Sequence, residues 1–215
     1  MQFYRKEYFC RKFLNLRLSF LLKCCNFTFQ TTLVMSTKTL LTSKEVTIIL
    51  HRLACQLVEK HLDFSNTVLI GIQPRGKFLA ERIKTILENE YNIQNLPLGF
   101  LDITFFRDDF RRSEKTLEAN KTQIDFLVED KKVIFIDDVL YTGRSIRAAL
   151  TAIQSFGRPK DIELMVLIDR RFSRHLPIQP DYRGRQVDAF NDEKVIVQWS
   201  GVDETSEDQV LIIEK

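Results

Sequence analysis

The sequence predicts an α/β fold in which a mainly parallel, twisted sheet is covered by helices on both faces. Short, continuous apolar runs such as Val68–Ile72 and Val133–Ile136 alternate along the chain with segments whose apolar residues recur at helical spacing. Apolar runs without a polar alternation are typical of strands buried on both faces. Strands that alternate with helices favour parallel pairing. With 215 residues, 44% of them hydrophobic, the chain is long enough for one such domain.

The segment 1–34 differs in composition from everything that follows. It is rich in Phe and Leu, basic, almost free of acidic residues, and holds Cys10, Cys24 and Cys25. Its apolar run Phe13–Cys25 is too short and too charged to span a membrane. We therefore expect an extra segment, disordered or an artefact of the translation start, followed by a single domain over residues 35–215. A signal peptide is the alternative, although no clean cleavage site follows.

The cysteine pattern supports neither a disulfide framework nor a metal site of the CxxC type, which fits a cytoplasmic protein. Lys and Arg outnumber Asp and Glu by 32 to 29, so the net charge alone argues neither for nor against nucleic acid.

The first half of the domain begins with a helix expected from about Ser43 to His61. Thr42 and Glu45 have the spacing of a capping box, and apolar residues follow at helical spacing. The buried strand Val68–Ile72 comes next and leads through a tight loop into a helix over Lys77–Asn89. A further strand is expected at Leu98–Phe106.

A densely charged stretch between Arg107 and Asp130 separates the two halves and is either a working loop or a solvated, disordered one. The strand Val133–Ile136 follows, and after Asp137–Ser145 a helix carries an apolar stripe from Ile146 to Phe156. Gly157 and Pro159 end that helix. The remaining strand candidates are Ile162–Ile168, Val195–Trp199 and Val210–Ile213.

The segment Asp137–Ser145 has the layout of a ligand site. The strand before it leads to two adjacent carboxylates, Asp137 and Asp138, and a Thr-Gly-Arg-Ser turn then opens the next helix. Ligands of open α/β sheets bind beyond the carboxyl ends of the strands, and backbone N–H groups at a helix N-terminus hold phosphate. Gly143 lets the backbone approach such an anion closely.

The carboxylates repel phosphate, so they must serve hydroxyl groups or a metal ion. A ligand with a phosphate near a diol is a ribose 5-phosphate. An Asp-Asp pair alone would more often be a helix cap with surface charge. The turn that follows at the right distance favours function here.

The run Val133–Ser145 resembles the phosphoribosyl-pyrophosphate signature of the type I phosphoribosyltransferases. Its core, Asp-Asp-Val-Leu-Tyr-Thr-Gly-Arg, is similar to one branch in particular, the bifunctional pyrimidine-operon attenuator/uracil phosphoribosyltransferases. The likeness extends over Thr39–Glu214. The other matching segments are Gly71–Gly76, Leu101–Asp109, Gly157–Pro159, Val166–Arg170 and His175–Tyr182.

This resemblance implies the type I phosphoribosyltransferase fold, with a small hood beside the sheet. It also implies a uracil phosphoribosyltransferase that converts uracil and phosphoribosyl pyrophosphate to UMP and pyrophosphate, with Mg²⁺. The substrate-binding residues that it implies are Pro74, Arg75, Gly76, Asp137, Asp138, Val139, Leu140, Tyr141, Thr142, Gly143, Arg144 and Ser145. Asp137 and Asp138 would face the ribose hydroxyls, directly or through the metal ion, and Arg75 would face the pyrophosphate.

Two further groups of site residues follow from the resemblance. Arg107, Asp108 and Asp109 match the start of a charged loop that closes over the site in relatives, which makes them a lid and adds Arg107 to the catalytic candidates Arg75, Asp137 and Asp138. The neighbourhood of the base is expected at Tyr141, Asp169 and Arg170. Tyr141 stands where relatives that use 6-oxopurines carry an aspartate, which weighs against hypoxanthine and guanine.

A basic group at His51, Arg52, Arg170, Arg171 and Arg174 matches a face with which relatives hold an mRNA leader when a uridine nucleotide is bound. Clustered arginines suit phosphate contacts, and RNA loops would supply specificity. The alternatives are a solubilising surface or a subunit contact, because relatives form homodimers or homotetramers.

Three functions therefore stay open: a uracil enzyme, an RNA-binding attenuator with little catalytic activity, and a phosphoribosyltransferase for a purine or orotate. Nothing in the sequence calls for a membrane partner.

Overall fold

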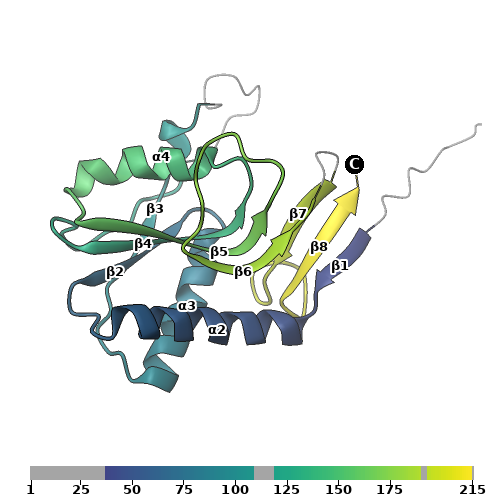
Figure 1. The fold of residues 1–215 in the computed structure, drawn as a ribbon, viewed down its shortest axis with the longest axis horizontal. Coiled ribbons are helices and arrows are strands. Elements are labelled where there is room, and N and C mark those ends of the chain that lie inside the picture. Colours follow the sequence, from purple (N-terminus) through teal and green to yellow (C-terminus); the bar gives the residue numbers. More distant parts are fainter. Residues whose placement is uncertain (1–36, 109–118, 190–192, 215) are drawn as a thin grey trace, which may run out of the picture. The chain divides into compact units, whose positions relative to one another are not determined.

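The larger of two sheets is parallel throughout, with its strands in the order β3-β2-β4-β5-β6 (Figure 1). This computed structural model describes residues 37–108, 119–189 and 193–214. The strands are β2 (Thr67–Ile72), β3 (Leu98–Leu101), β4 (Lys132–Leu140), β5 (Asp161–Arg170) and β6 (Tyr182–Val187). The prediction of a mainly parallel sheet is confirmed.

Helices cover both faces of this sheet. The helices α2 (Ser43–His61) and α3 (Gly76–Tyr91) lie on one face, and α4 (Arg144–Ile153) lies on the other (Figure 1). Within β4, Ile134 and Ile136 belong to the core under α2 and α3, whereas the alternating residues Val133 and Phe135 belong to the core under α4. Strands buried on both faces need apolar side chains on both, which explains the continuous apolar runs.

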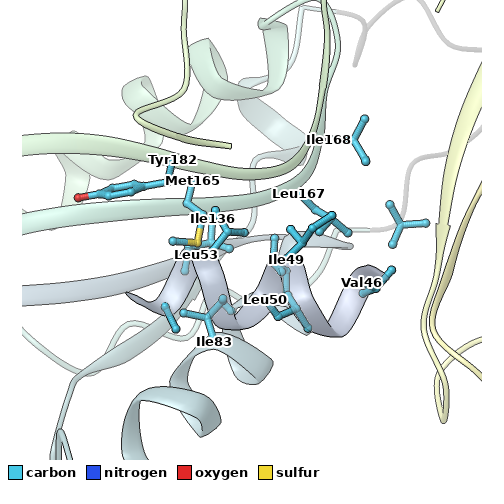
Figure 2. Close-up of a cluster of buried hydrophobic side chains, with 14 of the residues drawn as sticks. Val46, Ile49, Leu50, Leu53, Ile83, Ile136, Met165, Leu167, Ile168 and Tyr182 are labelled. Atoms are coloured by element: carbon cyan, nitrogen blue, oxygen red, sulfur yellow. The ribbon is translucent and has the colours of Figure 1, made fainter. Parts of the chain in front are cut away.

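The core under α2 and α3 is built from large aliphatic side chains. Figure 2 shows Leu53 of α2 and Ile83 of α3 beside Ile136 and Met165 of the two central strands. All four side chains are fully buried. This packing fixes α3 against the sheet, and with it the loop that leads into α3.

A smaller antiparallel sheet has the order β1-β8-β7 and joins the two ends of the described chain. Its strands are β1 (Thr37–Leu41), β7 (Glu193–Gln198) and β8 (Gln209–Glu214). It is the separate small sheet that the predicted fold class places beside the main one as a hood.

The two helices near the start of the domain begin as their sequences require. The Glu45 carboxylate accepts hydrogen bonds from the Thr42 backbone N–H and hydroxyl, at 2.8 and 2.9 Å, so the predicted capping contact is present. Helix α3 starts at Gly76, where any Cβ would clash with the Ile136 carbonyl oxygen of β4. Glycine therefore lets α3 start against the end of β4.

Several boundaries differ from the prediction. Strand β4 continues through the acid pair to Leu140, because pairing with β5 continues as far as Leu140 and Asp169. Strand β3 ends at Leu101, and a 3₁₀ turn over Thr104–Phe106 replaces its predicted second half. The strands β1 and β6 were not predicted.

Residues 1–34 lie outside the described part of the chain, so the expected domain boundary stays a prediction. Among the described residues, no helix is both long enough and apolar enough to cross a membrane.

Candidate active site

A pocket of about 240 Å³ opens where β4 ends and α4 begins. It therefore lies at the carboxyl ends of the parallel strands, where the sequence predicted a ligand site. Its lining consists of Arg107, Asp108, Asp137, Val139, Leu140, Tyr141, Thr142, Gly143, Arg144, Ser145 and Ile146. Most of the predicted substrate-binding residues thus come together around one cavity, whereas Pro74, Arg75, Gly76 and Asp138 are not among its lining residues.

The turn between β4 and α4 has the geometry of an anion site. Gly143, the N-cap of α4, has a φ of 89°, which glycine adopts without strain. The Gly143 carbonyl accepts the first helical hydrogen bond, from the Arg147 N–H at 3.0 Å. No acidic residue occupies the first turn of α4. The backbone N–H groups at this helix start, of which that of Arg144 has only a long contact of 3.4 Å with the Thr142 hydroxyl, would attract a negatively charged group.

The acid pair consists of two consecutive residues near the end of β4. Asp137 is buried, and its Oδ1 accepts a hydrogen bond from the Asp138 N–H at 3.0 Å. Asp138 Oδ1 accepts one from the Val139 N–H at 2.8 Å. Burial raises the pKa of both carboxyls. The charge of Asp138 raises the pKa of Asp137 further, while Arg75 opposes the rise at Asp138. A cation or hydroxyl donors at this place would favour the ionised pair.

The two carboxylates suit a Mg²⁺ ion that is bound together with the substrate better than they suit a metal ion whose ligands all come from the protein. Among the described residues there is no group of three or more His, Cys, Asp or Glu that could hold a metal ion. Mg²⁺ is commonly bound through one or two carboxylates together with substrate phosphates. Asp137 and Asp138 fit that donor set.

Arg75 approaches the acid pair from the loop before α3. Its Nε lies 3.7 Å from Asp138 Oδ2. The two terminal nitrogens bind both carboxylate oxygens of Asp203 at 2.9 and 2.8 Å, and one of them also donates to the Val197 carbonyl. Asp203 follows β7 and was not among the predicted residues. Because Asp203 lies far from Arg75 in the sequence, no local motif indicates that the two residues pair.

Arg107 and Asp108 line the pocket on the side of α4. Asp108 Oδ2 lies 3.1 Å from a terminal nitrogen of Arg147 and 3.7 Å from Arg144 Nε. Asp109 lies outside the described residues. The assignment of these residues to a lid stays a prediction.

The three residues expected near the base lie together at the adjoining ends of β4 and β5. The Arg170 guanidinium lies over the Tyr141 ring, 4.1 Å from its centroid. Arg174, from the connection that follows β5, donates to the Tyr141 carbonyl at 2.7 Å and binds the Asp169 carboxylate. Half-exposed Tyr141 is thus fixed from two sides at the mouth of the pocket.

A second, more polar pocket of about 420 Å³ is lined in part by the connection Arg171–Asp181. Its charged lining residues are Asp169, Arg171, Arg174, Asp181 and Arg183. The predicted RNA group is therefore split: Arg171 and Arg174 line this pocket, and Arg170 is buried beside Tyr141.

The two RNA candidates on α2 lie elsewhere and already have partners. His51 Nδ1 lies 2.9 Å from Glu90 Oε2. Arg52 donates to the backbone carbonyls of Arg183 and Gly184 at the edge strand β6. Arg183 joins the pocket through β6, a strand that the sequence did not predict.

The connection Arg171–Asp181 lines the second pocket and contacts residues that line the first. The His175 N–H donates to the carbonyl of Thr142, in the turn between β4 and α4, at 3.0 Å. A Cβ on Gly143 would lie 3.3 Å from Ile178 Cδ1 of the same connection. Ile178 also lines the second pocket.

Comparison with known proteins identifies relatives over most of the chain. Residues 36–205 match the family model of the phosphoribosyl transferase domain. The chain is 45% identical over 164 residues to the "Bifunctional protein PyrR" of Caldicellulosiruptor bescii, covering 76% of this chain and 87% of that protein. It is likewise 45% identical over 156 residues to the protein of the same name from Acetivibrio thermocellus, covering 71% and 82%.

Solved structures show the same fold at low sequence identity. A hypoxanthine-guanine phosphoribosyltransferase from Bacillus anthracis has a TM-score of 0.59 at 17% identity, covering 83% of this chain and 98% of that one. A hypoxanthine phosphoribosyltransferase from Staphylococcus aureus has a TM-score of 0.56 at 22% identity, covering 74% and 81%.

Proposed function

Because the chain belongs to the phosphoribosyltransferase family, and within it to the bifunctional PyrR proteins, we propose that it transfers a phosphoribosyl group from phosphoribosyl pyrophosphate to uracil. The products are UMP and pyrophosphate. The observation that carries this proposal is the turn Thr142–Ser145 at the start of α4, the phosphate turn, directly after the acid pair of buried Asp137 and partly buried Asp138.

The phosphate turn binds the 5-phosphate of the substrate. The backbone N–H groups of Thr142–Ser145 donate to its oxygens, and the hydroxyls of Thr142 and Ser145 add hydrogen bonds. Asp137 and Asp138 accept from the ribose hydroxyls. These contacts place C1 of the sugar between the base and the leaving pyrophosphate, so that little freedom has to be lost during the reaction.

The reaction forms a bond between a uracil nitrogen and C1 and breaks the bond from C1 to the pyrophosphate oxygen, while the nitrogen releases its proton. Positive charge develops on the ribose, and negative charge develops on the leaving group. Arg75 and Arg107 lie where they would neutralise the pyrophosphate, and the acid pair faces the sugar. Asp137 and Asp138 would hold Mg²⁺ together with the substrate, and the ion would supply further charge neutralisation.

Tyr141 and Arg170 line the base side of the site. Their stacked arrangement offers a flat surface next to C1 and no carboxylate at position 141. A carboxylate there is what the purine-using branch employs, so this arrangement supports a pyrimidine. Purine or orotate transfer remains the alternative enzyme.

RNA binding that responds to the nucleotide is the second part of the proposed function. The arginine-lined second pocket supplies cations for phosphate groups, and the connection Arg171–Asp181 contacts both that pocket and the phosphate turn. A nucleotide bound at the turn would therefore influence the position of the connection that carries Arg171 and Arg174. An attenuator with little turnover would use the same pocket only as a sensor.

The test is a panel of bases assayed with phosphoribosyl pyrophosphate and Mg²⁺ for release of pyrophosphate. We expect release with uracil and none with hypoxanthine, guanine or orotate. Asp138→Asn and Thr142→Ala should keep the fold and reduce turnover by roughly a hundredfold or more, as loss of a group that stabilises the transition state does. Equal release with a purine would replace the uracil assignment. Unchanged kinetics in both variants would refute the roles given to these residues.

A further inference from the structure

The turn between β7 and β8 is fastened to α3 by two arginine–aspartate pairs. At the start of α3, Arg75 binds Asp203 through both terminal nitrogens, at 2.9 and 2.8 Å. Further along the helix, Arg82 binds Asp208 through Nε and a terminal nitrogen, at 3.2 and 3.0 Å. Both contacts are bidentate, which fixes a guanidinium in orientation as well as in distance.

Asp203 is itself held in place by its own turn. Its Oδ2 accepts a hydrogen bond from the Trp199 backbone N–H at 2.8 Å, and Trp199 is fully buried. The Val197 carbonyl accepts a further hydrogen bond from the same Arg75. The small sheet therefore offers Arg75 a rigid set of acceptors rather than a mobile surface carboxylate.

The other neighbour of Arg75 is a carboxylate of the site. Asp138 Oδ2 lies 3.7 Å from Arg75 Nε, and the Asp138 side chain is only 14% exposed. A guanidinium released from Asp203 has this second carboxylate within reach, and bidentate pairing with it is strongly favoured in a poorly solvated place. Such pairing would withdraw both the cation and the carboxylate from the substrate.

We propose that Asp203 is a positioning residue for phosphoribosyl transfer: it keeps the 3.7 Å contact of the Arg75 guanidinium with Asp138 from closing into a bidentate pair, so that Arg75 stays available to the pyrophosphate and Asp138 to the ribose. Asp203 acts through Arg75 and does not itself contact the reacting atoms. The proposal rests on the proposed function, because it assumes that phosphoribosyl pyrophosphate is the ligand of Arg75 and Asp138.

Asp208 provides a matched control. It also binds an arginine of α3 and accepts a backbone N–H of the same turn, that of Ser200, at 2.8 Å. Its partner Arg82, however, lies over the Trp199 ring at 4.5 Å and forms its ion pair with Asp208, whereas Arg75 also lies 3.7 Å from the site carboxylate Asp138. Loss of Asp208 should therefore reproduce the structural cost of losing Asp203 without its effect on the site.

The experiment compares wild type, Asp203→Asn and Asp208→Asn by steady-state kinetics and by calorimetric titration with Mg²⁺–phosphoribosyl pyrophosphate. We expect Asp203→Asn to raise KM and Kd for this substrate about tenfold, about 1.4 kcal/mol of binding. KM for uracil should stay within about twofold, and Asp208→Asn should leave both substrate constants within about twofold. Both variants should melt below wild type.

An unchanged KM and Kd in Asp203→Asn, or an equal rise in Asp208→Asn, would overturn the proposal. If Asp203→Asn fails to fold, Asp203→Glu is measured instead. It keeps the charge but displaces the carboxylate, so a rise in KM and Kd for the pyrophosphate substrate supports the proposal and unchanged values overturn it. Wild-type protein that binds the substrate but transfers it to no base would refute the proposed function, while the titrations would still test Asp203.

Discussion

At the scale of single residues, Asp137 combines a cost in stability with the catalytic role proposed for it. Burial and the neighbouring charge of Asp138 raise its pKa in the folded protein above the ordinary value of 3.8. The contribution of this carboxyl to the free energy of unfolding is therefore most favourable below pH 3.8, and it is lost as the pH rises through the folded-state pKa. At neutral pH the ionised side chain works against folding.

Asp137→Asn should therefore stabilise the protein while it disables the enzyme. Asparagine keeps the oxygen that accepts the Asp138 N–H but carries no charge. We expect the variant to melt about 2–4 °C higher at neutral pH, the shift that about 1 kcal/mol produces in a domain of this size. Turnover should fall by roughly a hundredfold or more. Calorimetry and pyrophosphate release measure the two effects, and a lower melting temperature at neutral pH would contradict the assignment.

The residues that sequence reasoning found and those it missed differ in where their partners lie. The acid pair and the phosphate turn form one continuous segment, so their spacing alone predicts a ribose-phosphate site. Asp203, which was not predicted, and Arg174, which was predicted only as an RNA contact, depend on partners brought close only by the fold. Asp203 lies 128 residues from Arg75, and the Tyr141 carbonyl that Arg174 binds lies 33 residues away. Neither contact leaves a pattern in a single sequence.

At the scale of elements, a buried polar network ties the end of α2 to the first residues of β5 and β6. Glu163 Oε2 accepts a hydrogen bond from the Tyr182 hydroxyl at 2.6 Å and lies 2.9 Å from His61 Nε2. Lys60 Nζ lies 2.9 Å from the other carboxylate oxygen. Burial raises the pKa of Glu163, but the hydrogen bonds from Tyr182, Lys60 and His61 outweigh it, so the net pKa lies below 4.5.

Glu163→Gln should destabilise the protein at neutral pH by about 1.5–3 kcal/mol, the usual worth of hydrogen bonds to a charged group. A lowered folded-state pKa gives stability that is present above pH 4.5 and is lost as the pH falls through that pKa. The difference between wild type and variant in free energy of unfolding should therefore shrink in acid. Urea denaturation at pH 7 and near pH 3.5 measures it.

Glu88→Gln is the control for that experiment. Glu88 pairs with Lys84 one turn away on α3, at 3.6 Å. Removing this partly exposed helix pair should change the free energy of unfolding by less than about 0.5 kcal/mol at either pH. A Glu163 effect that stays constant between the two pH values would show that charge is not what the network contributes.

The elements that the sequence failed to predict are edge strands with little apolar content. Strand β6 contains two arginines and Gly184, and strand β1 is mostly exposed. Each is held by pairing with another strand, β6 with β5 and β1 with the distant β8, rather than by an apolar pattern of its own. For β4 the polar residues Asp137 and Asp138 suggested a strand end, although parallel pairing with β5 continues past them.

At the scale of the whole molecule, the two ends of the parallel sheet differ in chemistry. The network around Glu163 lies where β5 and β6 begin, and the first pocket lies where β4 ends. These stabilising polar contacts are thus separated from the acid pair, in which burial disfavours the charged form. The formal net charge of +3 is too small to draw RNA to the molecule as a whole, so any RNA contact has to come from the local arginines.

That local origin makes salt the decisive variable for RNA binding. Arg171 and Arg183 line the second pocket with side chains 55% and 56% exposed, which leaves them accessible to phosphate groups. Filter binding of a pyrimidine leader RNA across a salt series should give a linear fall of log affinity with log salt. Arg171→Ala and Arg183→Ala should each reduce the slope by about one and weaken binding to all sequences alike. Arg158→Ala, an exposed arginine just before β5, should change neither.

UMP should strengthen RNA binding by the wild-type protein, because the connection Arg171–Asp181 contacts the phosphate turn through His175 and reaches the second pocket. In the salt series this gain should appear as a shift of the whole line. Two outcomes would mean that RNA is attracted by surface charge in general. One is weak binding that UMP does not change, and the other is a salt slope that Arg158→Ala reduces as much as the other two variants do. The second pocket would then have no regulatory part, and the enzyme assignment would stand alone.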